Sequence, residues 1–444
     1  MSPAARAQFV HERLPAGGLF QDQHWRISPE PFTLSPQMVS EIESLGRVLL
    51  QFYRALNLLY RQSAEGKQPA WVADWLDQGK PAELIQWQRA NAFKNDVPRV
   101  IRPDLLITDN GLSIMELDSV PGGIGLTAWL NQVYSELAIE TKANGFPPRT
   151  ADTNGKGLNG KHGNAVLNPE AEILGGAEGM LRGFSQIFGE APRVHIIVSE
   201  EAATYMPEMR WVAERLGPRF QVQDARFNDF SPGDAVYRFF ELFDLPNVPN
   251  ARAIVEAAMD KRIRLTPPVK PVFEEKMMFA LLWNRNLSGF WRRQLGEGFF
   301  QRLLEMVPYS WLMDPTPLPP HAAIPELNIT DWRQLGALSQ RQRDLILKIS
   351  GFSPNAWGAR GVYLGSDLSQ GDWSAAVDQA LASFGTSPYI LQRYEKPRLE
   401  AASYYDFANS QVVPMPGRVR LCPYYFVQGE NDAARAHLGG VLAT

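Results

Sequence analysis

Four residues early in the chain have the types and spacing to hold a metal ion beside a phosphate. Asp104, Glu116 and Asp118 supply carboxylates, and Arg102 stands two residues before Asp104. Glu116 and Asp118 are two residues apart in a strand-like run, so both side chains leave the same face. Magnesium prefers hard oxygen ligands, usually carboxylates together with phosphates and water. We therefore predict a metal site at these acids, with Arg102 either orienting them or touching a transferred phosphoryl group.

A β-hairpin is expected to bring the acids together. Residues 99–118 form two extended runs around the turn Asp109–Gly111, and antiparallel pairing across that turn can put Asp104 beside Glu116. The glycine-rich segment Pro121–Gly125 follows directly, where missing side chains would let a ligand approach the backbone. An ordinary solvent-facing hairpin is the competing interpretation, and the flanking arginine and glycines favour a site.

Late in the chain, a lysine and a glycine-rich segment have the character of a phosphate site. Lys348 lies inside the apolar run Leu345–Ile349, where a buried ammonium needs an anionic partner. The segment Gly351–Gly361 could fold as a loop whose N–H groups bind phosphates. It does not have the G-x-x-x-x-G-K-[ST] pattern, so taken alone an ordinary glycine turn is the better interpretation. The acids and the cations would support phosphoryl transfer only if the fold brought them together.

The composition indicates a large globular protein. The chain has 444 residues, 45% of them hydrophobic, and a formal net charge of -4, which predicts two or three domains and no general attraction for nucleic acid or membrane surfaces. The one cysteine, Cys422, excludes an internal disulfide, and its strand-like surroundings predict a buried, apolar residue. There is no apolar leader and no run of roughly 18 apolar residues, so we expect a cytoplasmic protein.

Four parts are expected along the chain. Residues 1–95 read as a helical N-terminal region, and residues 96–150 contain the acid hairpin and a helix. Helices and strands alternate through residues 165–266, which is typical of a small parallel, Rossmann-like layer, although no G-x-G-x-x-G turn follows a strand. Residues 267–444 read as an α+β unit that carries the lysines. The polar, glycine-rich residues 154–163 are expected to be a linker.

Periodicity gives the expected elements within these parts. Helices are expected at 38–62, 126–141, 170–188, 204–216, 250–260, 273–291, 297–306, 333–343 and 373–384. Strands are expected at 193–198, 220–223, 235–240, 345–349, 361–365, 389–394 and 419–426.

Taken together, the acid hairpin and the lysine-bearing segments resemble the nucleotide site of the ATP-grasp superfamily. Lys276, Lys348, the glycine-rich cover and Gln392–Glu395 look like its nucleotide-binding half, and the Arg-x-Asp and Glu-x-Asp pairs look like its metal-binding strands. In most members the metal-binding strands come second. Here they come first, an order similar to the synthetase domain of glutathionylspermidine synthase and related circularly permuted ATP-grasp proteins. The resemblance covers residues 97–444 and implies an α/β (α+β) fold with a Rossmann-like pre-ATP-grasp domain and an N-terminal helical region.

The resemblance implies a role for each matching position. Asp104, Glu116 and Asp118 would hold magnesium, although Asp118 stands where the family usually has asparagine, and Arg102 would face the transferred phosphoryl group as the catalytic residue. The nucleotide-binding residues would be Lys276 and Lys348 on the phosphates, Ser353, Gly358 and Gly361 in the cover, Gln392 and Tyr394 at the adenine, and Glu395 at the ribose.

The implied activity is ATP- and magnesium-dependent ligation of a small-molecule carboxylate to an amine through an acyl phosphate. No cysteine precedes Cys422, so the cysteine-dependent amidase half of some glutathionylspermidine synthases is absent. One alternative is an ATP-binding scaffold or pseudoenzyme that keeps the fold without ligation. Another, an NAD-linked enzyme, is disfavoured because the phosphate-binding turn is missing.

Several other polar residues invite a functional interpretation. The six histidines are scattered, which makes a zinc site improbable, and His195 is expected to be a hydrogen-bonded strand residue. Arg418 and Arg420 alternate on one face of an expected strand, and either a phosphate or carboxylate contact or a surface ion pair would fit. For Arg238, embedded in apolar residues, a structural salt bridge is favoured over substrate binding. The final residues 438–444 look like the middle of a strand-and-turn region.

Overall fold

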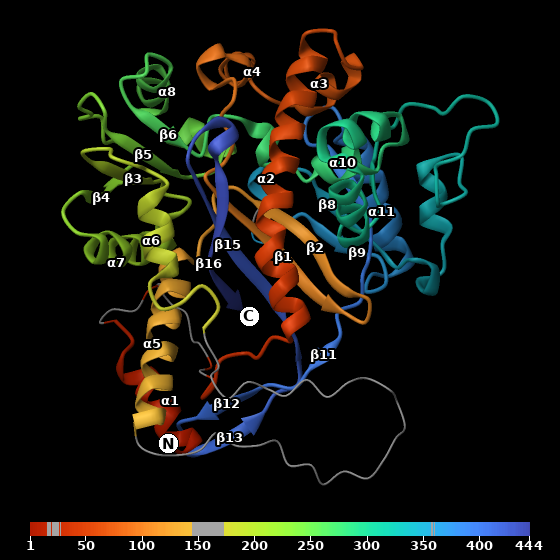
Figure 1. The fold of residues 1–444 in the computed structure, drawn as a ribbon. Helices are drawn as coiled ribbons and strands as arrows, with labels where there is room; N and C mark the ends of the chain where they lie inside the picture. The colour runs from red at the N-terminus through yellow and green to blue at the C-terminus, as the bar shows by residue number, and fades with distance from the viewer. Residues whose placement is uncertain (16–18, 20–25, 27, 144–172, 357, 359) are drawn as a thin grey trace.

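The computed structural model describes residues 1–15, 19, 26, 28–143, 173–356, 358 and 360–444. Three four-stranded sheets organise this part of the chain, and two short two-stranded ribbons accompany them. Figure 1 shows the first and last thirds of the chain interleaved at the centre of the molecule. The mixed α/β class expected from the sequence is confirmed.

The central sheet, called here the hairpin sheet, is antiparallel and has the strand order β16-β15-β1-β2. Its strands are β1 (Val100–Thr108), β2 (Gly111–Asp118), β15 (Arg420–Gln428) and β16 (Arg435–Ala443). Strands from the two ends of the sequence therefore form one sheet. The glycine at the hairpin turn, Gly111, has a φ of 119°, which a residue with a side chain rarely adopts.

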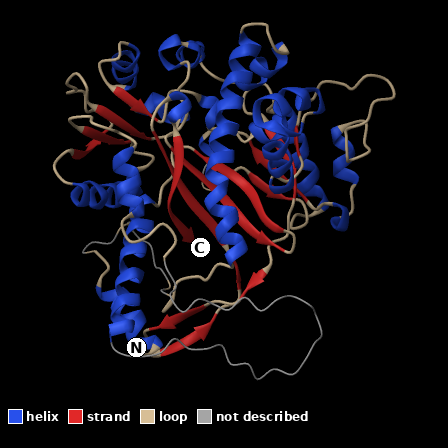
Figure 2. Cartoon of the chain, in the orientation of Figure 1, coloured by secondary structure: helices blue, strands red, loops and turns tan. Residues whose placement is uncertain are grey.

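Helices cover both faces of the hairpin sheet (Figures 1 and 2). On one face lie α2 (Pro36–Ala64), α9 (Met277–Trp283) and α10 (Ser288–Met306), whose apolar residues share a core with Leu105 and Leu421. On the other face lie α5 (Ile124–Ala143), α6 (Gly179–Gln186) and α7 (Met206–Leu216), which share a core with Tyr424 and Phe426. Residues alternate between the two cores along β15, as the period of two in a strand requires.

The parallel sheet has the order β4-β3-β5-β6. It consists of β3 (Val194–Val198), β4 (Phe220–Asp224), β5 (Ala235–Phe239) and β6 (Arg264–Thr266), and α8 (Ala251–Met259) precedes β6. The buried runs of β3 and β5 are apolar along their whole length apart from His195 and Arg238, as expected for strands covered on both faces. The Rossmann-like parallel layer expected between residues 165 and 266 is present in the described residues.

The third sheet, the lysine sheet, is antiparallel with the order β7-β10-β8-β9. Its strands are β7 (Ser310–Leu312), β8 (Leu345–Ile349), β9 (Val362–Leu364) and β10 (Tyr389–Arg393), and α11 (Gln370–Ala382) packs against it. The strands expected from Leu345, Gly361 and Tyr389 are confirmed, while β7 was not expected. Its three residues follow a helix too closely to give a strand pattern.

The remaining described elements are short. They are α1 (Pro3–Glu12), α3 (Ala70–Asp77), α4 (Ala82–Arg89), the ribbon β11 (Leu399–Glu400) with β14 (Gly417–Arg418), and the ribbon β12 (Ser403–Asp406) with β13 (Gln411–Pro414). Short 3-10 turns occur along the described chain at residues 91–93, 203–205, 242–247, 271–273, 285–287, 332–337, 340–342, 354–356 and 431–433. The expected linker at 154–163 and the expected boundary near it lie outside the described residues.

Three expected helices are wrong in extent or type. Within the described residues, the helix expected at 170–188 is only α6, Gly179–Gln186. The helix expected at 273–291 is instead α9 and the start of α10, separated at Asn284, whose backbone is extended and whose side chain accepts from the N–H of Asn286. The helix expected at 333–343 is two 3-10 turns separated by the extended Leu338. In these last two places a local side-chain-to-backbone bond competes with the helix. The helix expected at 297–306 is the second half of α10, beyond a kink at Gly296.

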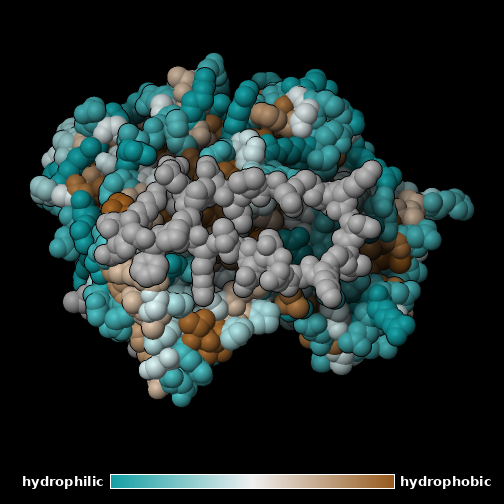
Figure 3. Space-filling model, turned by 60° about the horizontal axis from the view of Figure 1, so that its bottom comes forward, coloured by the Kyte–Doolittle hydropathy of each residue, from teal (hydrophilic) through white to brown (hydrophobic). Residues whose placement is uncertain are grey.

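Hydrophilic residues cover most of the described surface visible in Figure 3, and apolar residues form only small separate groups there. Among the residues that the structure describes, no helix is long and apolar enough to cross a membrane.

Candidate active site

The acid hairpin has the register that the sequence predicted. Asp104 of β1 lies directly opposite Glu116 of β2, and Arg102 lies opposite Asp118. A register irregularity follows, because Met115 is an extra residue on β2, and Ile114 and Leu117 on either side of the bulge both belong to the same core. The expectation that antiparallel pairing puts Asp104 beside Glu116 is confirmed.

Arg102 bridges the two aspartates. Its Nε lies 3.0 Å from Oδ1 of Asp104, its Nη2 lies 3.0 Å from Oδ2 of Asp118, and its Nη1 donates to the carbonyl of Gly122 at 3.2 Å. Burial raises the pKa of Asp118, although Arg102 and the N–H of Val120 oppose the shift. Two roles were considered for Arg102, and its contacts are those expected if it orients the acids.

A second cation reaches Asp104 from the neighbouring strand β15. Nη1 of Arg420 lies 3.1 Å from Oδ2 of Asp104, and Sγ of Cys422 donates to Oδ1 at 3.5 Å. The expectation that Arg418 and Arg420 share one strand is wrong, because Arg418 ends β14 and is exposed. Cys422 is buried as predicted, and burial, followed by the charge of Asp104, raises its pKa to about 12.

Both predicted lysines reach the hairpin. Nζ of Lys276 lies 2.8 Å from Oε1 of Glu116 and also donates to the carbonyl of Ala356 at 3.1 Å. Nζ of Lys348 donates to the carbonyl of Met115 at 3.0 Å. Burial alone would raise the pKa of Glu116, but Lys276 and then Lys348 bring it below its ordinary value. Burial lowers the pKa of Lys348 to about 8. The predicted meeting of the acids and the lysines is confirmed for Lys276. Lys348 reaches the same hairpin, but the anionic partner expected for it is wrong, because it donates to neutral oxygens of Met115 and Gln392.

A buried ion pair behind Lys276 fixes its position. Nζ of Lys80, from the loop between α3 and α4, lies 2.6 Å from Oε1 of Glu275, and both side chains are buried. Glu275 also accepts a hydrogen bond from the hydroxyl of Ser350, which follows β8. The N–H of Lys276 donates to the carbonyl of Ser350 at 2.7 Å. The N-terminal helical region, α9 and the lysine sheet are thereby joined at the lysine.

The glycine-rich segment after β8 turns tightly. Ser353 accepts from the N–H of Asn355 at 3.3 Å, and Gly358 has a φ of 63°. A Cβ at Gly361 would lie 2.7 Å from the carbonyl oxygen of Asn355, so only glycine fits there. Residues 357 and 359 lie outside the described part. The role of this segment as a phosphate cover stays a prediction.

Of the nucleotide residues predicted in and just after β10, one side chain is buried and two are half-buried. Gln392 is fully buried, accepts from Nζ of Lys348 at 2.8 Å and donates to Oγ of Ser310 at 2.9 Å. Tyr394 and Glu395, just beyond the strand, are half-buried. Gln392 thus holds Lys348, which the sequence did not predict, while the adenine and ribose contacts stay predictions.

The glycine-rich segment after β2 binds a side chain of the protein itself. The carboxylate of Glu208, on α7, accepts from the N–H groups of Gly123 at 3.2 Å, Gly125 at 2.7 Å and Leu126 at 3.0 Å, at the start of α5. Burial nevertheless raises the pKa of Glu208 to about 7. The expectation that this backbone is open to a ligand is therefore corrected, because Glu208 takes its donors. Nothing in the sequence around Glu208 distinguishes it from an ordinary helical acid.

The remaining polar residues behave largely as structural groups. His195 is buried and lies 3.2 Å from Oδ2 of Asp234, and Arg238 lies 2.7 Å from Oε1 of Glu274. Across the described ranges no three histidine, cysteine or acidic side chains are arranged to hold a metal ion. At the hairpin, each carboxylate faces an arginine or a lysine instead.

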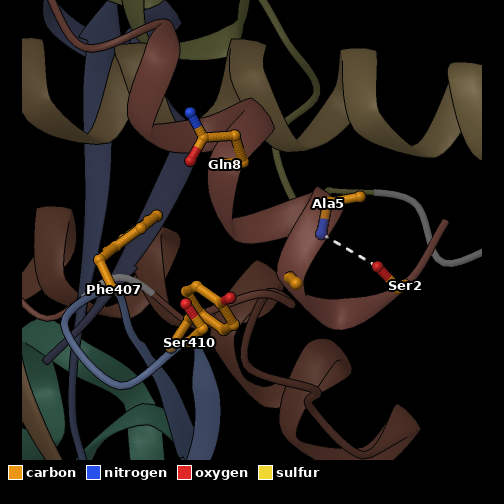
Figure 4. Close-up of a pocket in the computed structure, with 7 residues that line it drawn as sticks. Ser2, Ala5, Gln8, Phe407 and Ser410 are labelled. Carbon is orange, nitrogen blue, oxygen red and sulfur yellow. Dashed lines mark hydrogen bonds between the residues drawn. The ribbon is translucent and has the colours of Figure 1, made fainter.

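A surface hollow of about 500 Å³ lies between α1 and the ribbon β12–β13 (Figure 4). It is lined by Ser2, Ala4, Ala5, Gln8, Tyr405, Phe407 and Ser410. None of these carries a charge, and none belongs to the acid hairpin or the lysine-bearing segments, so the hollow is separate from the candidate site.

The chain matches no protein-family model and no curated protein sequence. Among solved structures, it is similar to the apo form of a glutathione synthetase-like effector from Globodera pallida, with a TM-score of 0.56 and 11% identity over 100% of this chain and 94% of that chain. A putative gamma-glutamylcysteine synthetase from Methylobacillus flagellatus aligns with a TM-score of only 0.36 and 12% identity over 88% of this chain and 82% of that chain, a likeness too weak to argue from. The chain thus has a mixed α/β fold similar to that of the glutathione synthetase-like effector.

Proposed function

We propose that this protein is an ATP- and magnesium-dependent carboxylate–amine ligase. The observation that carries the proposal is the 2.8 Å ion pair between Lys276 and Glu116, which joins the acid hairpin to the lysine-bearing segments. Phosphoryl transfer requires acids and cations to converge on one group, and here residues far apart in the sequence do so. The likeness in fold to a glutathione synthetase-like effector supports the same class.

The order of the strands supports a circularly permuted ATP-grasp arrangement, similar to the synthetase domain of glutathionylspermidine synthase. Residues 96–150 would be the metal-binding part, residues 267–444 the nucleotide-binding part, and residues 165–266 the pre-ATP-grasp domain. Residues 1–95 would form a helical cap. The pairing of β1 with β15 joins the first two of these parts in one sheet, as expected if they are halves of one unit.

The proposed reaction has two steps. A carboxylate oxygen of the acid attacks the γ-phosphorus of ATP, the bond to the bridging oxygen breaks, and ADP leaves with that electron pair. The amine nitrogen, having lost a proton, then attacks the acyl carbon, and inorganic phosphate leaves. The protein supplies no nucleophile, so its residues act by binding, orientation and charge stabilisation.

The four cations at the hairpin are suited to an anionic substrate. Lys276, Lys348, Arg102 and Arg420 surround three acids, so the site carries enough positive charge to take phosphate oxygens as well. Lys348, held by Gln392, is buried and presents a fixed ammonium. These residues would bind the phosphates and stabilise charge on the transferred group.

The three carboxylates fit magnesium by their donor chemistry, since all are hard oxygen ligands on one face of the hairpin. Asp104, Glu116 and Asp118 would hold the ion, and magnesium would neutralise charge on the phosphates. Nucleotide phosphates would offer Arg102 and Lys276 new partners and so release carboxylate oxygens. The extra charge of Asp118, compared with asparagine, is matched by Arg102.

Isothermal titration of the full chain with Mg-ATP tests the proposal. Wild-type protein is expected to bind, and Lys276→Met is expected to weaken binding at least tenfold, as loss of a charged phosphate contact implies. The control is Lys67→Met, a lysine whose side chain is 67% exposed. No binding of Mg-ATP by the wild-type chain would exclude the ligase.

The competing function is an ATP-binding scaffold without ligation. The observation in its favour is that every hairpin carboxylate already has a cation, which is a stable arrangement without substrate. ADP release in the presence of glutathione and spermidine, lost in Glu116→Gln, would exclude the scaffold. Mg-ATP binding without ADP release for any tested acid and amine pair would favour it.

A further inference from the structure

One peptide unit beside the acid hairpin is held at both of its ends. Its carbonyl oxygen, that of Gly122, accepts from Nη1 of Arg102 at 3.2 Å and from the hydroxyl of Tyr424 at 2.7 Å. Its N–H, that of Gly123, donates to Oε2 of Glu208 at 3.2 Å. Because a peptide unit is planar, a carboxylate that holds its N–H also determines where its carbonyl oxygen points. Arg102 and Glu208 are therefore linked through a single rigid group.

The surroundings of this peptide, and not its own sequence, set its orientation. Gly122 and Gly123 have no side chains, and Gly123 has a φ of 88°, so the backbone alone permits many orientations. A Cβ at Gly122 would collide with the ring of Tyr205, and one at Gly123 would lie 2.5 Å from the hydroxyl of Tyr424. The peptide thus lies in a close-fitting space between the start of α7 and β15, where only glycines fit.

Glu208 is a buried acid that is held by backbone N–H groups. It is fully buried, and no ion pair among the described residues reaches it. Its Oε1 accepts from the N–H groups of Gly125 and Leu126 in the first turn of α5, where the helix dipole favours a negative charge. A glutamine oxygen could accept the same two bonds, but its NH₂ would then face the N–H of Gly123. The bond to Gly123 is therefore the contact that requires a carboxylate.

The carbonyl of Gly122 is the third point that fixes the guanidinium of Arg102. The other two are Asp104, 3.0 Å from Nε, and Asp118, 3.0 Å from Nη2. A planar guanidinium held at three points is fixed in both position and orientation. Loss of the third point would let the guanidinium turn away from one of the aspartates.

We propose that Glu208 is a positioning residue for Arg102 and acts through the Gly122–Gly123 peptide. With this peptide held, the guanidinium stays across Asp104 and Asp118 and keeps the two carboxylates at a fixed spacing. Glu208 lies on α7, within residues 165–266, so this part of the chain controls the geometry of the acid hairpin. The effect on nucleotide binding rests on the proposed ligase function, whereas the link between Glu208 and Arg102 is measurable without nucleotide.

NMR of the ¹⁵N-labelled full chain tests the link. The Nε–H resonance of Arg102 is identified by its loss in Arg102→Met. In Glu208→Gln this resonance should shift, because the acceptor of the guanidinium moves. Asp234→Asn is the matched control, since Asp234 is also fully buried and accepts a backbone N–H, that of Ser231 at 2.8 Å. Its substitution should leave the Arg102 resonance in place.

Titration calorimetry of the same proteins with Mg-ATP tests whether the link reaches the site. Glu208→Gln is expected to weaken Mg-ATP binding roughly fivefold, as loss of one well-placed hydrogen bond implies. Asp234→Asn should change the affinity by less than about twofold. A residue that only supported the fold would leave both the resonance and the affinity of the folded protein unchanged.

The outcomes separate this role from the ligase. A shifted Arg102 resonance in Glu208→Gln, without Mg-ATP binding by the wild type, would keep the link and exclude the ligase. An unmoved resonance would overturn the positioning role, and Mg-ATP binding by the wild type would then leave the ligase standing. Equal shifts in Asp234→Asn, or a shift with unchanged Mg-ATP affinity, would also overturn the role. If Glu208→Gln does not fold, the shorter Glu208→Asp replaces it, and the same shift is expected.

Discussion

Asp104 and Glu116 lie directly opposite each other on β1 and β2, yet each is paired with a different cation from a distant part of the chain. Arg420 of β15 pairs with Asp104, and Lys276 at the start of α9 pairs with Glu116. Two adjacent carboxylates would repel each other without such partners. The hairpin therefore depends on residues far away in sequence. Substitution of the arginines and lysines that pair with its acids should change both stability and metal binding.

Substitution of Arg102 tests how the acids are neutralised. Arg102→Met removes the cation shared by the buried Asp104 and the half-buried Asp118, and the free energy of unfolding in EDTA should fall by about 3 kcal/mol. Millimolar Mg²⁺ should restore part of this loss, because the freed carboxylate oxygens are magnesium ligands. Urea unfolding with EDTA or Mg²⁺ measures both effects.

The control for this experiment is an exposed arginine. Arg285 pairs with Glu326 at 3.5 Å, and its side chain is 69% exposed, so Arg285→Met should change the unfolding free energy by less than about 1 kcal/mol. If Mg²⁺ does not raise the unfolding free energy of Arg102→Met, a metal role for Asp104 and Asp118 is contradicted.

The buried pair Lys80–Glu275 should be strongly coupled. Lys80→Met and Glu275→Gln each leave a buried polar partner unpaired and should each cost about 3 kcal/mol of unfolding free energy. The double variant should cost about 1–3 kcal/mol less than the sum of the two. A double-mutant cycle by urea unfolding gives the coupling energy, and additive costs would contradict the pairing. Glu275→Gln should also weaken Mg-ATP binding, because Lys276 follows it directly.

The sequence predicted the acid hairpin because two local rules agree there. The Asp109–Gly111 turn sets the pairing, and the strand period of two puts Arg102 and Asp104 on one face. A third rule, that an ammonium in an apolar strand needs an anionic partner, indicated Lys348, although its partners are the neutral oxygens of Met115 and Gln392. These rules are local, so they predict which residues belong to the hairpin and the lysine strand but not the contacts between them.

What the sequence did not predict depends on contacts between distant segments. Glu208, on α7, caps the start of α5 from another helix. The break between β14 and β15 separates Arg418 from Arg420 because each strand pairs with a different partner. Lys276 is the N-cap of α9 and not an interior helical residue, and its N–H donates to the carbonyl of Ser350.

Gly351 is expected to be required for the position of Lys276. A Cβ at this residue would collide with the backbone carbonyl of Glu274 and would lie 3.1 Å from Oε2 of Glu275. Gly351→Ala should therefore cost about 1–3 kcal/mol of unfolding free energy and weaken Mg-ATP binding. Urea unfolding and calorimetry measure the two effects.

A second glycine provides the matched control. Gly298 lies within α10, and a Cβ there would have no atom within 4 Å, so Gly298→Ala should stabilise the protein by about 0.5–1 kcal/mol. Equal effects of the two substitutions would show that the close approach at Gly351 is not what matters.

Lys270 should make stability depend on pH. Its Nζ donates to Oδ1 of Asn57 at 2.8 Å and to the carbonyl of Asp96 at 2.9 Å, and burial lowers its pKa from 10.5 to about 7, against the opposing charge of Asp96. Between these two values the unfolded chain binds more protons than the folded one, so the free energy of unfolding rises with pH. Below about pH 7 both states are protonated, and the contribution of Lys270 no longer changes.

Comparison with Lys270→Met isolates this contribution. The unfolding free energy of the wild type relative to the variant should rise by up to about 1.4 kcal/mol per pH unit above pH 7, and other titrating groups cancel in the difference. Urea unfolding at several pH values between neutral and alkaline gives the slope. The unfolding free energy of Lys67→Met, at an exposed lysine, should change with pH in the same way as that of the wild type. If the unfolding free energy of Lys270→Met also follows the wild type across this pH range, Lys270 keeps its proton in the folded state. Asn57 and the Asp96 carbonyl would then stabilise the ammonium enough to offset its burial.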